Sequence, residues 1–313
     1  MRPRAFSNPG RFYRGNLHTH CTVSDGKLDA AEVCRRYRAR GYDFLAITDH
    51  FMGRYGYPIT DTRGFRDDRF TTLLGAELHS GGNDLGEIWH ILAVGLPADF
   101  APSNSPDGSP RPDQETGPEI ARRASEAGAF VAIAHPEWSG LSEADMASID
   151  AADAVEVYNH GCEVECDRGG GLHAADILAR SGRRVSFVST DDAHFTHGEL
   201  DAYGGWVMVK AETNEPEALL RALKDGAMYS TTGPDFVDLE FAGDEVRVAC
   251  SGASAVILQG QPSATVGAFG EALTEARLPI GRLAESPWLR VTLTDAAGGK
   301  AWSNPVWRDQ GAW

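Results

Sequence analysis

The sequence predicts an α/β protein in which residues 1–233 form a barrel and residues 234–313 form a small antiparallel β-sheet domain. Up to about residue 233, short apolar strands alternate with amphipathic helices, which is typical of a parallel α/β arrangement. Metal-ligating residue types follow nearly every one of these strands. A barrel gathers such residues at the carboxyl ends of its strands, whereas an open doubly wound sheet concentrates them at one switch point, so the pattern favours a barrel. After Pro234 the strands are joined by short turns with no convincing helix, which predicts the second domain.

The composition argues against a dedicated nucleic-acid surface. The 313 residues include 45 acidic and 29 basic side chains, for a formal net charge of −16, whereas binding to nucleic acids normally requires a basic field. A small anionic substrate stays compatible with this charge, because bound divalent cations can invert the local field.

The chain shows no targeting or membrane-spanning segment, and its cysteines suit a reducing compartment. The first ten residues carry basic side chains but no apolar run, and no other stretch approaches transmembrane length. The five cysteines are an odd number in a long chain, which favours the cytoplasm. Cys162 and Cys166 are interpreted as loop or buried thiols, because no second half of a zinc site has matching spacing.

The first helix is expected between Asp29 and Gly41. Asp29 is a plausible N-cap with Glu32 three residues later, and Gly41 suits the position after the helix end. A buried strand, Phe44–Thr48, then leads directly into Asp49 and His50. The other barrel strands are expected at Thr71–Ala76, Ile88–Leu96, Phe130–Ala134, Ala154–Tyr158, Val185–Ser189, Gly205–Lys210 and Ala227–Thr231, with helices at Glu119–Ala127, Leu172–Arg180 and Glu215–Lys224 and a polar loop at Pro97–Pro118. The C-terminal strands are expected at Asp238–Phe241, Glu245–Val248, Ala255–Leu258, Leu289–Leu293 and Ala301–Trp302.

A His-x-His pair near the N-terminus indicates a metal site. Residues i and i+2 of an extended segment point to the same side, so His18 and His20 can offer two imidazole nitrogens to one ion. Asp25 follows at a turn, where its carboxylate can act as a further ligand or as a general base.

Further residues of the same types are spread along the barrel and are too numerous for a structural zinc site. The full set is His18, His20, Asp25, Asp49, His50, Glu77, His79, His90, His135, Glu156, Asp191, Asp192 and His194. Structural sites are usually tetrahedral and rich in cysteine. A set dominated by nitrogen and oxygen suits two or three catalytic divalent ions such as Mn, Fe or Zn.

Six ordered motifs within residues 15–232 resemble the PHP (polymerase and histidinol phosphatase) family. They are His18-x-His20, Ser24-Asp25-Gly26, Ile47-Thr48-Asp49-His50, Gly75-Ala76-Glu77, Ala134-His135-Pro136 and Asp192-Ala193-His194. The resemblance implies a distorted (β/α)7, TIM-like barrel with a trinuclear metal site that hydrolyses phosphoesters. The tail from Trp288 to Pro305 is similar to a branch of this family that includes carbaryl-hydrolase-like metallohydrolases.

The resemblance also implies a ligand set, position by position. His18, His20, Glu77 and Asp192 would hold one ion; Glu77 would bridge to a second ion held by His90 and His135; Asp25, His50 and His194 would hold a third. Asp192 is preferred to Asp191 because Asp-x-His is the family spacing, and His79 competes with His90. Asp49 is expected to orient an imidazole, and Glu156 and Asn159 either support the ligands or only end their strand.

These inferences predict a metal-dependent phosphoesterase of a small molecule or nucleotide, in which a metal-bridging hydroxide attacks phosphorus. The predicted catalytic residues are His194, His160 and Asp49, and the predicted substrate-binding residues are Arg54, Arg63, Arg168 and His197. The expected partner is a small anionic phosphoester, with no stable nucleic-acid surface and no membrane. The alternatives are a carbamate or ester metallohydrolase, a noncatalytic PHP-type binding module, and a nuclease acting on oligonucleotides.

Overall fold

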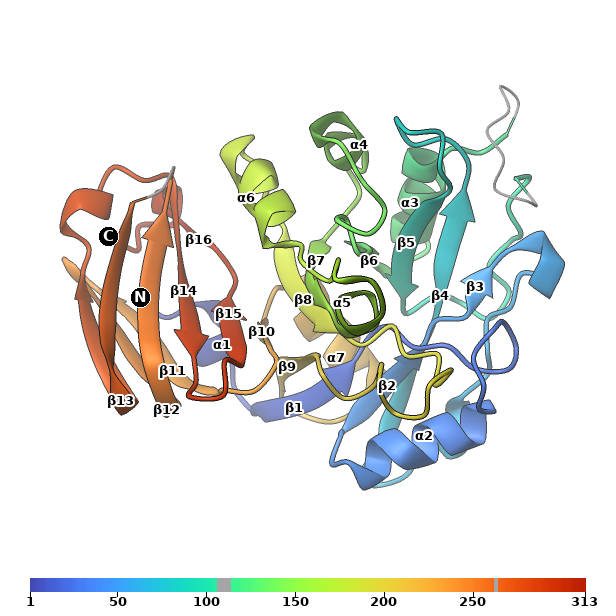
Figure 1. Cartoon of the computed structure of the whole chain (residues 1–313), viewed down its shortest axis with the longest axis horizontal. Coiled ribbons are helices and arrows are strands. Elements are labelled where there is room, and N and C mark those ends of the chain that lie inside the picture. The colour runs from blue at the N-terminus through green and yellow to red at the C-terminus, as the bar shows by residue number, and fades with distance from the viewer. Residues whose placement is uncertain (106–113, 262–263) are drawn as a thin grey trace.

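One long mixed β-sheet runs through both parts of the chain (Figure 1). The computed structural model describes residues 1–105, 114–261 and 264–313, so residues 106–113 of the expected Pro97–Pro118 loop lie outside the described residues. The N-terminal part contains strands β1 (Arg11–Asn16), β2 (Phe44–Ile47), β3 (His50–Phe51), β4 (Thr71–Ser80), β5 (Trp89–Val94), β6 (Phe130–Ile133), β7 (Ala154–Asn159), β8 (Ser186–Thr190), β9 (Trp206–Ala211) and β10 (Met228–Thr231). The C-terminal part contains β11 (Phe236–Ala242), β12 (Glu245–Gly260), β13 (Thr265–Pro279), β14 (Trp288–Thr294), β15 (Lys300–Ser303) and β16 (Val306–Trp307).

The helices lie almost entirely in the N-terminal part. They are α1 (Arg4–Ser7), α2 (Ala30–Ala39), α3 (Gly117–Glu126), α4 (Glu143–Ser148), α5 (His160–Cys166), α6 (Leu172–Arg180) and α7 (Pro216–Lys224), with 3-10 turns η1 (Gly53–Tyr55), η2 (Arg63–Phe65), η3 (Gly281–Leu283) and η4 (Arg308–Gln310). In α2, the Asp29 carboxylate accepts a hydrogen bond from Glu32 N at 2.8 Å, and Gly41 has a φ of +80° after the helix end. Helices α4 and α5 were not expected from the sequence, because each is too short to show helical periodicity.

The strand pairing is only partly parallel. The β1–β2–β4 and β6–β7–β8 pairs are parallel, as the alternation of strands and helices predicts. In contrast, β5 is antiparallel to both β4 and β6. The connection between β4 and β5, residues 81–88, is too short for a crossover helix and therefore forms a hairpin. Strand β9 is antiparallel to both β1 and β10.

The predicted barrel closure is not confirmed. Strand β8 is the last strand at one end of the sheet. Within the described ranges, no ladder of backbone hydrogen bonds joins β8 to β9 or β10. The two ends of the curved segment nevertheless approach each other. Ser230 Oγ on β10 donates to the Phe187 carbonyl on β8 at 2.7 Å, and an isolated parallel bridge pairs Thr19 with Ala193. This bridge brings the segment after β1 against the segment after β8.

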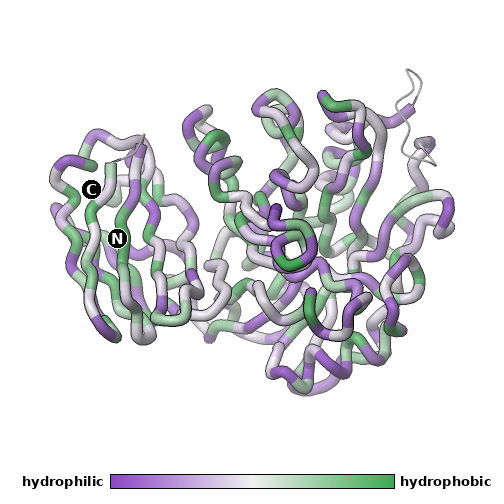
Figure 2. Tube along the Cα trace, in the orientation of Figure 1, coloured by the Kyte–Doolittle hydropathy of each residue, from purple (hydrophilic) through white to green (hydrophobic). Residues whose placement is uncertain are grey.

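Apolar packing on both faces fixes the curved sheet. One core lies between strands β4–β8 and helices α3, α4 and α6, and includes Ile120, Ile133 and Leu178. A second core joins the opposite strand faces to α7 through residues such as Phe44, Val209 and Leu223. Hydrophobic stretches follow the strands, and hydrophilic residues gather in the connections (Figure 2).

The C-terminal strands lie together at one end of the molecule (Figure 1). They enclose a separate apolar cluster that includes Leu239, Val256 and Leu293. Strands β11, β14 and β15 contain expected segments, and β12 joins the segments expected at Glu245–Val248 and Ala255–Leu258 into one strand. Strand β16 was missed, and so was β13. Its side chains are mostly exposed and its sequence is rich in Gly and Ala, so it lacks the apolar alternation that marks a strand. The N-terminus joins this part, because the Met1 amine donates to the Phe241 carbonyl. The domain boundary near residue 233 stays a prediction.

None of the described helices combines the length and the apolar character that a membrane crossing requires. All five cysteines are free thiols.

An ion pair between a buried guanidinium and a partly exposed carboxylate ties the C-terminal sheet to α6. Arg290, on β14, is 2% exposed and makes a bidentate contact with Asp176 at 3.0 Å. We predict that Asp176→Ala lowers the free energy of unfolding by about 2 kcal/mol, because the guanidinium loses its carboxylate partner while it stays buried. The exposed Arg122–Asp150 pair supplies the control: Asp150→Ala should change stability by less than about 0.5 kcal/mol in the same urea titration. Equal effects of the two substitutions on the free energy of unfolding would contradict a special stabilising role of the Asp176–Arg290 ion pair.

Candidate metal centre

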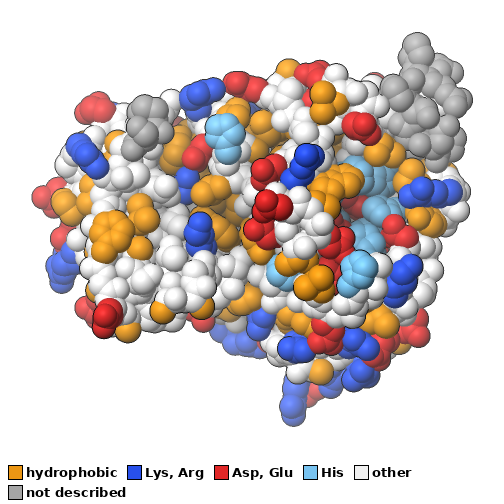
Figure 3. Space-filling view, in the orientation of Figure 1, with side chains coloured by type: hydrophobic (Ala, Val, Ile, Leu, Met, Phe, Trp, Pro, Cys, Tyr) orange, Lys and Arg blue, Asp and Glu red, His pale blue; other side chains and the backbone are white. Residues whose placement is uncertain are grey.

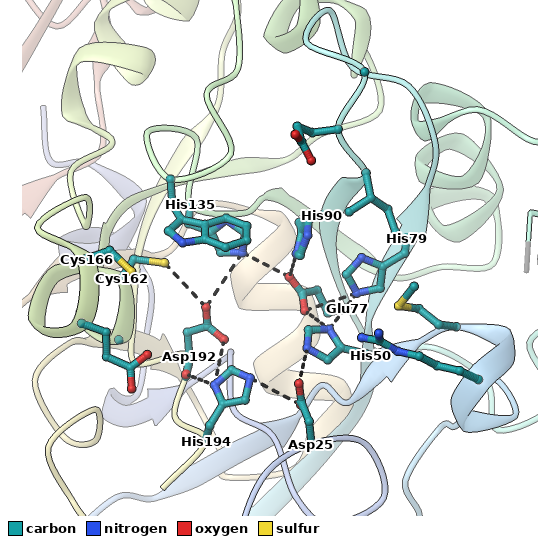
Figure 4. A pocket seen from close by; sticks show the side chains of 18 residues that line it. Asp25, His50, Glu77, His79, His90, His135, Cys162, Cys166, Asp192 and His194 are labelled. Atoms are coloured by element: carbon teal, nitrogen blue, oxygen red, sulfur yellow. Dashed lines mark hydrogen bonds and ion pairs between the residues drawn. The ribbon is translucent and has the colours of Figure 1, made fainter. Parts of the chain in front are cut away.

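Histidines and carboxylates from both ends of the curved sheet meet in one hollow of the surface (Figure 3). They leave the strands at or near their carboxyl ends. His18 and His20 follow β1, Glu77 lies near the end of β4, His135 follows β6, and Asp192 follows β8. His90 comes instead from the start of β5, which suits an antiparallel strand entering the same edge of the sheet. Figure 4 shows Glu77, His90, His135 and Asp192 pointing toward one another.

Four groups of side chains bring their ligand atoms within 4.8 Å of one another. The groups are His20, Asp25, His50 and His194; His18, Glu77 and His135; His18, His20 and Asp192; and His50, Glu77 and His79. His90 adjoins the second group, because its Nδ1 lies 2.6 Å from Glu77 Oε1, while His135 Nε2 lies 3.2 Å from the same oxygen. All nine ligands that the resemblance implies are thus brought together, and His79 joins them.

Backbone pairing between two distant segments positions three of these residues. His20 N donates to the Ala193 carbonyl at 2.9 Å, and Asp192 N donates to the His18 carbonyl at 2.9 Å. Asp192 has a φ of +56°, which an L-residue rarely adopts. This conformation turns its carboxylate toward the imidazoles, so that Oδ1 lies 3.0 Å from His20 Nε2 and 3.1 Å from His18 Nε2.

Neighbouring polar groups orient the imidazoles. Glu156 Oε1 lies 2.8 Å from His18 Nδ1, and Ser139 Oγ lies 2.9 Å from His135 Nδ1. His194 Nδ1 lies 2.8 Å from the carbonyl oxygen of Asp192 and must donate its hydrogen to it. Each of these three rings is held by Nδ1, so that Nε2 faces the centre, as is usual for metal-binding histidines.

The carboxylates of the centre are ionised at neutral pH. Burial alone would raise the pKa of Glu77, but the neighbouring imidazoles of His90 and His50 hold it well below the usual value. Burial likewise opposes ionisation of Asp192, whose pKa is held well below the usual value chiefly by His18. The pKa of Asp25 is also lowered against the effect of burial, by His50.

The imidazoles divide into two electrostatic classes. Burial, together with the nearby rings of His194 and His50, lowers the pKa of His20 to about 4, and burial lowers that of His90 to about 3. For His50, burial is outweighed by the Glu77 and Asp25 carboxylates, which raise its pKa to about 10. His20 and His90 therefore present neutral nitrogens at physiological pH, the form in which imidazole binds metals.

Two buried atoms test whether divalent ions fit this centre. His18 Nε2 and Glu77 Oε2 are fully buried, and neither makes a hydrogen bond with any group in the described ranges. Burying such atoms without an aligned hydrogen bond is costly, whereas an ion would satisfy both. The donors are imidazole nitrogens and carboxylate oxygens, which suit Mn, Fe or Zn. The residues present therefore fit the cofactor that the sequence predicts.

The centre lies in a cavity of about 600 Å³. Of the predicted substrate-binding residues, Arg54 lines this cavity, and Arg63, Arg168 and His197 do not. Arg63 instead makes a bidentate ion pair with Asp61 on the surface, at 2.8 and 2.7 Å. The remaining walls, which sequence reasoning did not select, include Met52, Glu87, Ile88, Trp138, Cys162 and Glu165.

Two predicted catalytic residues point away from the cavity. Asp49 is buried and accepts hydrogen bonds from Cys21 N at 2.9 Å and Ser24 Oγ at 2.7 Å, so it braces the turn that carries Asp25. Among the described residues, no hydrogen bond or ion pair joins Asp49 to an imidazole, so the expectation that Asp49 orients one directly is wrong. His160 Nδ1 lies 3.0 Å from Tyr158 Oη, and the ring packs against Gly204 outside the cavity lining. His194 does line the cavity.

The two adjacent aspartates have different roles. Asp192 faces the imidazoles, whereas Asp191 is buried behind it and accepts hydrogen bonds from Asn16 Nδ2, Tyr37 Oη and three backbone amides. Burial raises the pKa of Asp191 to about 6 despite these donors. Asp192, the member selected by the Asp-x-His spacing, is thus the one that faces the imidazoles, and Asp191 holds the backbone behind it.

Comparison with known proteins supports the fold. No family model matches the chain. An uncharacterized protein of Methanocaldococcus jannaschii is 24% identical over 214 residues, which are 66% of this chain and 84% of that protein. Among solved structures, a two-domain protein from Bacteroides vulgatus that contains a predicted PHP-like metal-dependent phosphoesterase matches with a TM-score of 0.52 at 12% identity, over 94% of this chain and 95% of the other. An amidohydrolase from Chromobacterium violaceum matches at a TM-score of 0.40 and 17% identity, over 57% of this chain and 87% of the other. The first structure shows that this chain has a PHP-like fold. The similarity of the tail to carbaryl-hydrolase-like enzymes stays a prediction.

Ion binding should stabilise the fold measurably. A ligand that binds only the native state at 100 times its dissociation constant adds about 2.7 kcal/mol to the free energy of unfolding. We therefore predict that Zn²⁺ or Mn²⁺ raises the urea midpoint of the chelator-treated protein. The increase should be much smaller in Glu77→Gln, which removes the carboxylate shared by two of the three ligand sets, and should persist in full in the exposed control His173→Gln. A metal-induced increase of the urea midpoint that is as large in Glu77→Gln as in the wild type would contradict the role of Glu77 in the metal centre.

Proposed function

We propose that this protein is a metal-dependent hydrolase that cleaves a phosphoester of a small molecule or nucleotide. The observation that carries the proposal is the convergence of ligand groups that share residues inside one cavity. Glu77 and His18 each belong to two groups, so ions bound there would lie side by side. The PHP-like fold, seen in a protein that contains a predicted metal-dependent phosphoesterase, supports the same conclusion at the level of fold.

The residues that would hold the ions follow the expected assignment. His18, His20, Glu77 and Asp192 would hold one ion, Glu77, His90 and His135 a second, and Asp25, His50 and His194 a third. Bound divalent ions polarise a phosphoryl oxygen and lower the pKa of water, which supplies a nucleophile at neutral pH. We infer Mn, Fe or Zn from the mixture of nitrogen and oxygen donors.

The protein's own residues would prepare the cavity for this chemistry. Glu156 and Ser139 hold His18 and His135 in the orientation that keeps Nε2 toward the centre. His194 has its Nδ1 hydrogen engaged by the Asp192 carbonyl and its Nε2 3.5 Å from Asp25 Oδ1, which favours a ligand over a proton donor. Of the three arginines expected to bind substrate, Arg54 alone lines the cavity, so its guanidinium is our candidate for gripping an anionic oxygen.

The cavity walls support a substrate with an apolar or aromatic body. Met52, Ile88 and Trp138 line the cavity beside the ligand groups, and the Trp138 side chain is 40% exposed. Its indole ring meets the rings of His135 and His90 at centroid distances of 4.9 and 5.2 Å. A nucleobase or an aryl group is the kind of substrate body that such a wall accommodates. The same wall suits an aryl carbamate, which keeps carbonyl hydrolysis as the second candidate function.

A substrate panel tests the proposal. With Mn²⁺ supplied, the protein should release phosphate or the phenolate from p-nitrophenyl phosphate, its bis-ester or a nucleotide. His18→Ala should lose this activity by at least about 100-fold together with one bound ion. Turnover of an aryl carbamate without any phosphoester turnover would contradict the first function and support the second.

The role of Arg54 can be measured separately. We predict that Arg54→Ala raises KM for phosphoesters about tenfold, because a charge-assisted contact to the anion is worth about 1.4 kcal/mol or more. Arg63→Ala is the matched control and should leave kcat/KM unchanged, because Arg63 is paired with Asp61 outside the cavity. Equal losses in the two variants would remove Arg54 from the site.

A further inference from the structure

His79 is buried in the centre but has no place in the three ligand sets assigned above. It lies on β4 directly opposite His90 on β5, so both rings project from the same face of the hairpin. The His79 side chain is 2% exposed, and its Nε2 lies 2.8 Å from His50 Nδ1 in hydrogen-bonding geometry. Two imidazole nitrogens at this distance require that one carries a hydrogen and the other a lone pair.

A backbone carbonyl decides which nitrogen carries the hydrogen. His79 Nδ1 lies 2.9 Å from the carbonyl oxygen of Trp89. A carbonyl oxygen can only accept, so His79 Nδ1 must be the donor in that contact. In the neutral ring the hydrogen is then on Nδ1, and His79 Nε2 presents a lone pair to His50.

The position of the hydrogen on His79 also determines which nitrogen of His50 carries a hydrogen. With an acceptor at His79 Nε2, His50 Nδ1 must carry a hydrogen, so in the neutral ring, the form that binds metals, the lone pair is on His50 Nε2. That nitrogen lies 3.3 Å from Asp25 Oδ2, within the group that also contains His20 and His194. Glu77 Oε2 lies 2.6 Å from His50 Nδ1 but makes no hydrogen bond among the described groups, so it stays available to an ion.

We propose that His79 is a positioning residue whose Nε2 accepts the Nδ1 hydrogen of His50 and thereby fixes the His50 tautomer that turns Nε2 toward the ion site of Asp25, His20 and His194. The chain Trp89 carbonyl–His79–His50 then sets the direction of one ligand from a backbone atom of the neighbouring strand. The proposal rests on the metal centre of the proposed function, but not on its phosphoester chemistry.

The structure also contains the arrangement that competes with this proposal. His50, Glu77 and His79 bring their ligand atoms within 4.8 Å of one another. An ion held there by His79 Nε2 and His50 Nδ1 would require His50 Nδ1 to lose its hydrogen. The two arrangements therefore predict opposite states for a single nitrogen atom.

Zinc binding and nitrogen NMR of the full chain test the proposal with His79→Gln, His79→Leu and the exposed control His173→Gln. In Zn²⁺-loaded wild-type protein, we expect the His50 ring to show hydrogen on Nδ1 and zinc on Nε2. His79→Leu removes the acceptor and should weaken one Zn²⁺ site roughly 10- to 100-fold in chelator competition, with the same number of ions bound at saturation. His79→Gln should keep most of that affinity, because its amide oxygen can accept the same hydrogen, and the control should match the wild type.

Three results would overturn the role of His79. The first is hydrogen on His50 Nε2 in the Zn²⁺-loaded wild-type protein. The second is a His79→Leu variant with unchanged Zn²⁺ affinity. The third is the loss of one whole zinc equivalent in both His79 variants, which would make His79 a ligand. Absence of phosphoester hydrolysis alongside the expected zinc behaviour would overturn the proposed function alone and leave the role of His79 standing.

Discussion

The buried carboxylate of Glu77 is the constraint on which the rest of the centre depends. The residue is 1% exposed, yet its oxygens lie 2.6 Å from His50, 2.6 Å from His90 and 3.2 Å from His135. Removing an ionised carboxylate from water costs several kcal/mol unless opposite charge surrounds it. The fold meets this requirement by directing imidazoles at Glu77 from neighbouring strands, and divalent ions would meet it more completely, because Glu77 Oε2 is still without a hydrogen bond in the described structure.

This requirement explains features of the surrounding backbone. The segments after β1 and β8 pair through Thr19 and Ala193, although no continuous ladder closes the sheet between β8 and β9 in the described chain. Asp191 and Asp49, both fully buried, brace these segments from behind by accepting backbone and hydroxyl hydrogen bonds. The left-handed φ of Asp192 is tolerated there because both sides of the turn are held. Asp191 and Asp49 therefore do not face the cavity but hold in place the backbone segments that carry the residues facing it.

The residues that meet in the centre could be predicted because their signals are local; their role as ligands stays a prediction. The His18-x-His20 spacing, the strand endings at Glu77 and His135 and the Asp192-x-His194 spacing each place a side chain relative to its own strand. What failed depends on contacts that no periodicity or spacing in the sequence displays. The direction of Asp49 is set by the turn at Cys21 and Ser24, the antiparallel pairing of β5 by the hairpin after β4, and the pairing of Arg63 by Asp61. His79 was weighed only as a substitute for His90, because the hairpin register that places both rings in one centre is not visible in a single strand.

Anomalous X-ray diffraction from crystals of the protein equilibrated with Zn²⁺ tests the central claim most directly. The account predicts strong zinc peaks among His18, His20 and Asp192, between Glu77 and the pair His90 and His135, and among Asp25, His50 and His194. Ions bound only at surface positions, with the Glu77 carboxylate contacted by imidazoles alone at saturating Zn²⁺, would contradict it.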